Sequence, residues 1–362
     1  MSALNDVLSA IDDFRSDLFS IQNSAEAALT PAAAKAGLRG MLGNLVSPLE
    51  NIHATGVGIR RKMGKRLPLE FVIKVYVFHK IAGLGKLIPK ILSKTFHGVD
   101  IDIEELPVMQ IQAKKKTRTA RAASASVTPP SQQQVPRRPI LGGFEIQPQG
   151  ASSAGTLGGF VRSISGPSTV FALSNNHVLA NTNRLAIGTE ISQPSSSSVT
   201  DVFGHLTSFE TIQLASPANP FPARNRIDAA IARVTDMTLV QTGSMFGISN
   251  YTPSLKAPLP GMAVTKSGRT TGVTAGSVTS IRVNGVRVNY GTPMAPLIGT
   301  FDGCIQVVGN GGSPFSAGGD SGSFILEQAT GRPVALLFAG NGETTTACDL
   351  LSVCTRFSVL PI

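Results

Sequence analysis

Cysteine is scarce in this chain of 362 residues, and tryptophan is absent. The three cysteines, Cys304, Cys348 and Cys354, are odd in number and form no C-x-x-C pair, which argues against a disulfide framework and against a zinc site. We therefore expect no metal and no cofactor. A chain without structural disulfides is typical of a reducing compartment.

Long apolar runs are also missing. No window holds 18 apolar residues without a charge, so the sequence predicts no membrane span. The stretch MSALNDVLSAIDDFRSD lacks the basic start and the unbroken apolar core of a signal peptide. We accordingly expect a cytoplasmic protein.

Charge is low overall and unevenly placed. Charged residues make up only 15% of the chain, whereas Gly and Pro are plentiful, which favours a turn-rich β protein over a helical bundle. The net charge is +10, and residues 1–140 hold 20 Lys or Arg against 11 Asp or Glu. The basic excess therefore belongs to the N-terminal part, and the remainder of the chain is close to neutral.

Residues 1–49 read as a helical N-terminal segment. Apolar residues from Leu4 to Leu18 recur at helical spacing, and an Ala-rich stretch over 24–46 predicts a second helix. Packing on the rest of the protein or on a second copy is the simpler interpretation. Docking of a separate partner protein is the alternative.

Residues 50–112 read as a small α/β subdomain, since GVGIRRK, EFVIKVYVFHK and GVDIDIEELPVMQIQ have strand character around a helical or irregular KLIPKILSK. Residues 113–139 are basic, then rich in Ser, Ala, Pro and Gln, and predict a flexible linker. The linker's basic cluster has no interleaved aromatic residues, so we do not expect a nucleic-acid partner.

Residues 140–362 consist of short apolar stretches between Gly, Pro, Asn and Ser, as in TVFALSNNH, GSVTSIRV and PVALLFAG. A less strand-like stretch at 236–257 divides this region into two halves. The pattern predicts a mainly β fold with two barrels and a crevice between them.

The segment Gly318-Gly319-Asp320-Ser321-Gly322 has the composition of a nucleophile loop. A serine hydroxyl is a weak nucleophile that needs a neighbouring base and backbone N–H donors for the developing oxyanion. Flanking glycines allow a tight turn, so the N–H groups of Gly319 and Ser321 are candidates for an oxyanion hole. A plain flexible loop is the alternative for such a Gly-rich stretch.

A candidate base and its orienting acid lie in two other stretches. His177 ends an apolar strand in ALSNNHVLAN, and Asp228 opens another in RIDAAIARV. A core histidine and a turn-capping aspartate are the simpler interpretations. His205 has no comparable surrounding motif, and we interpret it as structural.

Together these stretches resemble the chymotrypsin-like serine peptidases in their order along the chain and in their local sequence. The intervals of 51 residues from His177 to Asp228 and 93 residues from Asp228 to Ser321 also match. A closer resemblance, over most of 52–362, is to intracellular trypsin-like peptidases of bacteria and plants. GVGIRRK, IKVYV, SAGTLGGFVR, KSGRTTGVTAGSVTSI and FSAGGDSGS carry it. The resemblance implies two chymotrypsin-like β-barrels preceded by the α/β unit and the helical segment. It also implies a triad of His177, Asp228 and Ser321.

Two departures from that pattern bear on activation and specificity. Ile140-Leu141-Gly142-Gly143 resembles an activated N-terminus, but Pro139 precedes it, so we expect a first barrel strand and an internally satisfied Asp320. By spacing, Phe315 would form the floor of the S1 pocket, while Phe338, Ala339 and Gly340 would line the substrate. With no carboxylate in 310–319, the sequence predicts an apolar or small P1 residue.

The leading hypothesis is an intracellular serine endopeptidase that performs limited proteolysis on a protein or peptide substrate. One form of it is a bacterial defence protease that activates an effector such as a pore-former. A peptide-binding scaffold with marginal hydrolysis is the alternative. A nucleic-acid-associated factor working through the basic linker is a third.

Overall fold

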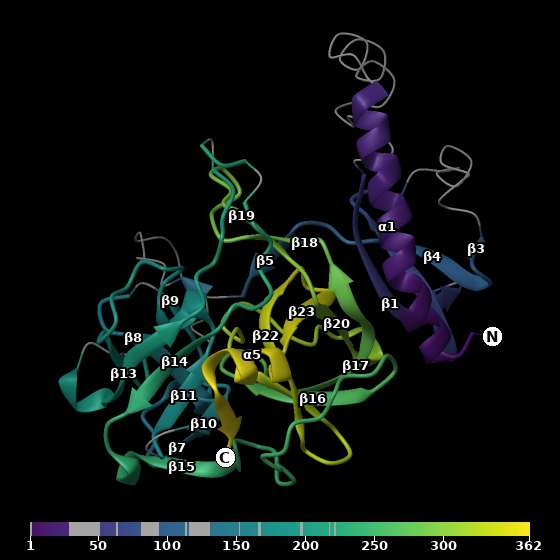
Figure 1. Cartoon of the computed structure of the whole chain (residues 1–362). Coiled ribbons are helices and arrows are strands. Elements are labelled where there is room, and N and C mark those ends of the chain that lie inside the picture. Colours follow the sequence, from purple (N-terminus) through teal and green to yellow (C-terminus); the bar gives the residue numbers. More distant parts are fainter. Residues whose placement is uncertain are drawn as a thin grey trace, which may run out of the picture.

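The computed structural model describes residues 2–28, 51–62, 64–80, 94–112, 114–115, 131–151, 153–165, 168–195, 198–216, 218–220 and 222–362 (Figure 1). Within these residues, none of the helices combines the length and the apolar character needed to cross a membrane.

The C-terminal part of the chain closes into a six-stranded antiparallel barrel. Each strand pairs with two neighbours, and the ring closes because β21 pairs with β16. In hydrogen-bonded order the strands are β16 (Ala263–Gly268), β17 (Gly272–Asn284), β20 (Cys304–Gly309), β23 (Thr344–Asp349), β22 (Pro333–Gly340) and β21 (Phe324–Glu327). β-Branched side chains such as Val264, Val278 and Val307 fill the interior, as the pleat of a small barrel requires.

A second antiparallel sheet, largely teal in Figure 1, curls into a half-barrel beside the first. Its order is β24 (Val359–Pro361), β10 (Gly159–Ser163), β11 (Val170–Ser174), β14 (Ala230–Val234), β13 (Val202–Phe209), β12 (Glu190–Ser192), β8 (Glu145–Pro148), β9 (Ser153–Thr156) and β6 (Lys114–Lys115). The last helix, α5 (Leu350–Phe357), leads from the closed barrel to β24 and so ties the two sheets together.

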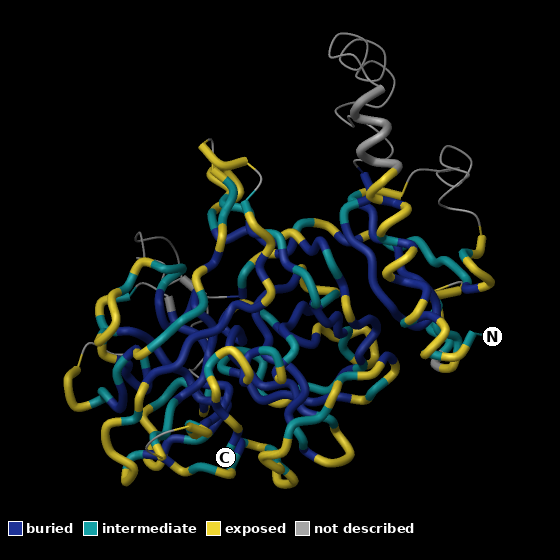
Figure 2. Tube along the Cα trace, viewed as in Figure 1, coloured by how far each residue is buried: buried dark blue, intermediate teal, exposed yellow. Residues whose placement is uncertain are grey.

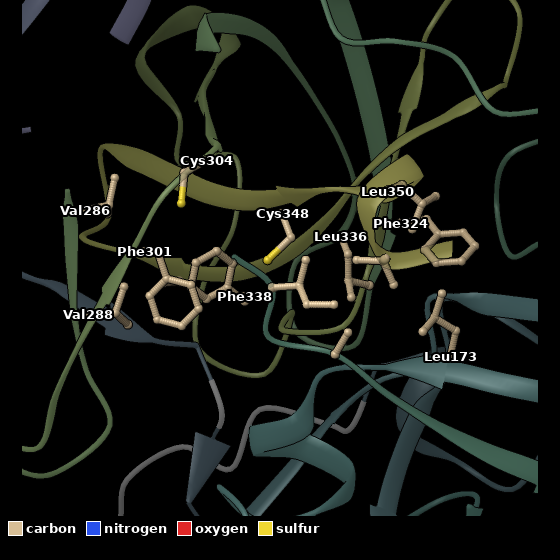
Figure 3. Packing of buried hydrophobic residues seen from close by; sticks show 14 of the residues in the cluster. Leu173, Val286, Val288, Phe301, Cys304, Phe324, Leu336, Phe338, Cys348 and Leu350 are labelled. Atoms are coloured by element: carbon tan, nitrogen blue, oxygen red, sulfur yellow. The ribbon is translucent and has the colours of Figure 1, made fainter. Parts of the chain in front are cut away.

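The two sheets share one apolar core. Leu173 of the half-barrel belongs to the same buried cluster as Phe324 and Leu336 of the closed barrel (Figure 3). Gly158 permits this approach, because a Cβ there would lie 2.6 Å from a ring carbon of Phe324. The crevice between the sheets is therefore fixed by tight packing on both sides.

The N-terminal part extends the closed barrel's sheet. Its strands are β1 (Ile52–Lys62), β2 (Lys65–Val77), β3 (Thr95–Phe96) and β4 (Val99–Glu105), and β1 pairs with β17 of the barrel. The short strand β5 (Met109–Ile111) runs between β22 and β18 (Val286–Asn289), and β18 pairs with β19 (Ile298–Phe301). The described strands β1 to β5 are thus built into the sheet of the closed barrel.

Helix α1 (Leu4–Ala28) covers these N-terminal strands. Its buried residues Val7, Ile11, Phe14 and Leu18 recur at helical spacing, and the Phe14 ring meets Phe96 edge-on at 5.3 Å. Figure 2 shows the strands beneath α1 as buried, while the outward side of the helix is exposed. The apolar stripe of α1 therefore packs on its own protein, which is the simpler of the two interpretations of this segment.

The remaining elements connect the sheets. They are η1 (Gln132–Gln134), β7 (Ile140–Gly142), α4 (Asn176–Leu179), η2 (Val199–Asp201), η3 (Met237–Leu239), β15 (Val240–Met245) and η4 (Asn310–Gly312). β7 and β15 form a separate parallel pair.

The predicted fold class is confirmed: the chain is mainly β, with two barrels preceded by an α/β unit and a helical segment. The second helix expected over 24–46 begins inside α1, which continues to Ala28, and its remainder lies outside the described residues. Most of the KLIPKILSK stretch lies outside them as well. Within the expected linker 113–139, β6 and η1 are regular elements, because each of them bonds to a neighbouring part of the protein.

Candidate active site

His177 and Asp228 lie in contact at the edge of the half-barrel. His177 is in the single-turn helix α4, which follows β11, and Asp228 precedes β14, the neighbour of β11. His177 Nδ1–H donates to Asp228 Oδ2 at 2.5 Å, and the backbone N–H of His177 lies 3.2 Å from Oδ1. Both side chains are buried. A carboxylate bound to Nδ1 in this way leaves Nε2 as the ring nitrogen available to accept a proton.

The closed barrel also holds Asp228. The Tyr290 hydroxyl donates to Asp228 Oδ2 at 2.9 Å, and the Asp228 backbone N–H lies 3.3 Å from Cys348 Sγ. Burial, together with the neighbouring Asp228, raises the pKa of the Tyr290 hydroxyl well above its ordinary value. Tyr290 therefore remains a neutral donor, and the buried carboxylate is satisfied from both barrels.

Ser321 lies on the loop before β21 and is fully buried. A Cβ on Gly155 would lie 2.5 Å from a methyl of Val178 in α4 and 3.0 Å from Ser321 O, so the helix of His177 and the loop of Ser321 meet at this glycine. Ser321 Oγ–H donates to Phe338 O at 3.1 Å. His177 Nε2 is buried without a hydrogen-bond partner among the described residues. The hydroxyl is thus turned toward β22.

The backbone at Gly319 adopts a conformation that favours glycine. Its φ is +109°, where a side chain would be strained, and its carbonyl accepts from Thr156 Oγ1 at 2.8 Å. The Gly319 N–H donates to the carbonyl oxygen of Gln112. The N–H group that the sequence predicts for the oxyanion hole therefore binds a carbonyl oxygen in this structure.

Asp320 is satisfied inside the protein, as the sequence predicts. Its carboxylate lies 3.3 Å from Lys266 Nζ and accepts from the Thr270 N–H at 2.8 Å and from the Ala317 N–H at 2.9 Å. Burial lowers the pKa of Lys266, although Asp320 opposes that shift. Ile140 is buried in β7. Lys266 is thus the cationic partner of Asp320 among the described residues.

The four residues predicted to contact substrate fall into two groups. Phe338, Ala339 and Gly340 end β22 and bond to β5, with Ala339 opposite Ile111 and Gly340 opposite Gln110. Phe315 is fully buried in the closed barrel's core cluster, where a Cβ on Gly276 would touch its ring at 2.7 Å. The structure thus buries the first three at the pairing of β22 with β5 and packs the Phe315 ring in the closed barrel's core.

Three residues of the site escape sequence reasoning: Tyr290, Lys266 and Gln112. Tyr290 follows a β-strand with no local motif around it. Lys266 opens the KSGRTTGV stretch, which gives no sign that its partner is Asp320. Gln112 borders the predicted linker. Only the pairing of distant strands brings these residues to the site.

Comparisons with known proteins give structural similarity alone. No protein-family model matches the chain, and no curated protein matches it. Solved structures similar to it include a glutamic acid-specific serine protease that utilises a histidine triad in substrate binding, at 23% identity and a TM-score of 0.42 over 62% of this chain and 100% of the other. Thermobifida fusca protease A gives 20% and 0.43 over 62% and 98%, and Cellulomonas bogoriensis chymotrypsin gives 18% and 0.41 over the same shares. Because these sequence identities and TM-scores are low, the two-barrel architecture is established by the strand pairing of this chain.

Proposed function

We propose that the chain is a serine endopeptidase that acts through Ser321, His177 and Asp228. The observation that supports this best is the buried hydrogen bond between His177 and Asp228, reinforced by Tyr290, beside a loop whose Gly319 N–H binds a carbonyl oxygen. A histidine oriented by a carboxylate, a serine and an amide donor for a carbonyl oxygen are the groups that acyl transfer requires.

In the proposed mechanism, the Ser321 hydroxyl turns from Phe338 O toward His177 Nε2 and attacks the substrate carbonyl. His177 takes the hydroxyl proton and passes it to the leaving amine, while Asp228 stabilises the imidazolium. The Gly319 and Ser321 N–H groups hold the oxyanion. Water then hydrolyses the Ser321 ester with His177 as base.

The substrate class follows from the backbone groups at the end of β22, which pair with β5 in this structure. A peptide in extended form that takes the place of β5 can pair with residues 338–340 as a strand, which favours a protein or peptide substrate. Limited proteolysis in the cytoplasm is the setting that we propose, since Cys304, Cys348 and Cys354 are all free thiols.

The alternative function is a peptide-binding scaffold. It is favoured by one observation, namely that Ser321 Oγ bonds to Phe338 O and not to His177. Under that alternative the site binds a backbone strand without turning over.

A fluorophosphonate probe separates the two functions, because it reacts only with a serine that is activated by a base. We expect labelling of the full chain that is lost in Ser321→Ala and in His177→Ala. The exposed Ser254, replaced by alanine, is the matched control and should label like the wild type. Correctly folded protein that never labels would exclude the endopeptidase and leave the scaffold.

A further inference from the structure

The chain's own residues cross the candidate active site. β5 pairs antiparallel with the end of β22, placing Ile111 opposite Ala339, and the Gln112 N–H donates to Phe338 O at 3.3 Å. On the other side of the crevice, β6 pairs antiparallel with β9, placing Lys114 opposite Ala154. The residues that end at Gln112 therefore lie along the closed barrel, and Lys114 and Lys115 lie along the half-barrel.

Both the backbone and the side chain of Gln112 contact the protein around them. Its carbonyl oxygen accepts from the Gly319 N–H, the donor proposed for the oxyanion hole. Its side chain is only 5% exposed and lies over Gly340, where a Cβ would come within 2.2 Å of Gln112 Nε2. This is the placement of a residue whose carbonyl is about to be attacked.

The Ser321 hydroxyl and the backbone of Gln112 form hydrogen bonds to the same atom. Phe338 O accepts from the Gln112 N–H and also from the Ser321 hydroxyl. The hydroxyl and the Gln112 N–H therefore share one acceptor, and attack on the Gln112 carbonyl carbon requires the hydroxyl to turn away from it.

We propose that the chain cleaves itself after Gln112, an inference that rests on the proposed serine endopeptidase function. Ser321 Oγ adds to the Gln112 carbonyl carbon and gives its proton to His177. The bond from Gln112 to the next nitrogen breaks, and that nitrogen takes the proton to become the amine of a new N-terminus, Ala113. Water hydrolyses the Gln112 ester, leaving a Gln112 carboxylate and the Ser321 hydroxyl restored.

The surroundings of the Gln112 side chain select for its shape more than for its polarity. Gln112 Oε1 is buried and has no hydrogen-bond donor among the described residues. An apolar side chain of the same length therefore fits equally well, whereas a buried ammonium there would have no partner.

The decisive experiment follows the full chain by denaturing intact-mass spectrometry during incubation. Denaturation is needed because β1 stays paired with β17 and would hold the pieces together. We expect fragments 1–112 and 113–362 from the wild type and none from Ser321→Ala. Because the reaction is within one molecule, its half-life should not change on dilution.

Substitutions at Gln112 test the pocket. Gln112→Lys should slow the cut by at least about tenfold, which corresponds to about 1.4 kcal/mol in the barrier. Gln112→Met should be cut at a rate similar to that of the wild type. The exposed Gln328, changed to lysine, is the matched control for an added charge and should leave the rate unchanged.

Each outcome is decisive. A chain that remains intact while Ser321 reacts with the fluorophosphonate overturns self-cleavage and leaves the proposed function standing. A chain that neither cuts nor labels overturns both. A cut at another bond, or one that persists in Ser321→Ala, also overturns the inference.

Discussion

Replacing Lys266 tests whether one buried cation holds the nucleophile loop. Lys266 Nζ lies 3.3 Å from Asp320 Oδ2, and both side chains are fully buried. Nζ also bonds to Thr271 Oγ1 and, at 3.0 Å, to Gly272 O. Lys266→Met keeps the length of the side chain but leaves the Asp320 carboxylate buried and unpaired.

Loss of one partner from a buried pair costs about 3–5 kcal/mol, because the remaining charge keeps its desolvation penalty. That is a large share of the folding free energy of an ordinary protein, which is about 5–15 kcal/mol. We expect Lys266→Met to lose about 3–5 kcal/mol in urea unfolding. Its kcat/KM should fall too, because Asp320 also binds the Ala317 N–H of the nucleophile loop.

Two comparisons make this result interpretable. Lys256 lies 3.2 Å from Glu327 Oε1 with its side chain 33% exposed, so Lys256→Met should cost no more than about 1 kcal/mol. The double variant Lys266→Met/Asp320→Asn should recover part of the loss, since it removes the buried negative charge. If Lys266→Met is as stable as Lys256→Met, the pair does not hold the loop and the reasoning is wrong.

Two further predictions concern Asp228 and the N-terminal strands. Tyr290→Phe removes a 2.9 Å donor from Asp228, so we expect a loss of about 1.5–3 kcal/mol in urea unfolding and a lower kcat. A kcat equal to that of the wild type would indicate a purely structural tyrosine. Burial lowers the pKa of His53 from 6.5 to about 4. The neutral ring's contribution is therefore complete above pH 6.5 and is lost as the pH falls toward 4, by up to about 1.4 kcal/mol per pH unit. His53→Gln should lose less stability between about pH 7 and pH 5 than the wild type does, and equal losses would contradict this role for the ring.

Sequence patterns predicted the features that depend on local spacing. The helical period from Leu4 to Leu18 gave α1, and alternating apolar stretches gave the strands of both barrels. His177 and Asp228 were paired by family resemblance, and they lie in contact. The helix, the strands and the motifs around His177 and Asp228 could be predicted because each is encoded within a few consecutive residues.

Features that depend on long-range register could not be predicted. Tyr290 reaches Asp228 only because β18 leads it back across the crevice, 62 residues farther along the chain. Gln112 bonds to Gly319 only because β5 is inserted between β18 and β22. No local pattern distinguishes a strand that ends at a linker from one that continues through an active site.

The strand pairing also predicts how the N-terminal part can regulate the proposed enzyme. β1 is bonded to β17, and β5 is bonded on both sides, with the Met109 side chain fully buried in the shared core. A cut after Gln112 would therefore leave its new carboxylate at the site, held by main-chain bonds that the cut does not touch. Because an external peptide needs the same groups on residues 338–340, it must compete with β5. Access for other substrates then depends on detaching β5, so a protein that binds the N-terminal strands could control activity without contacting Ser321.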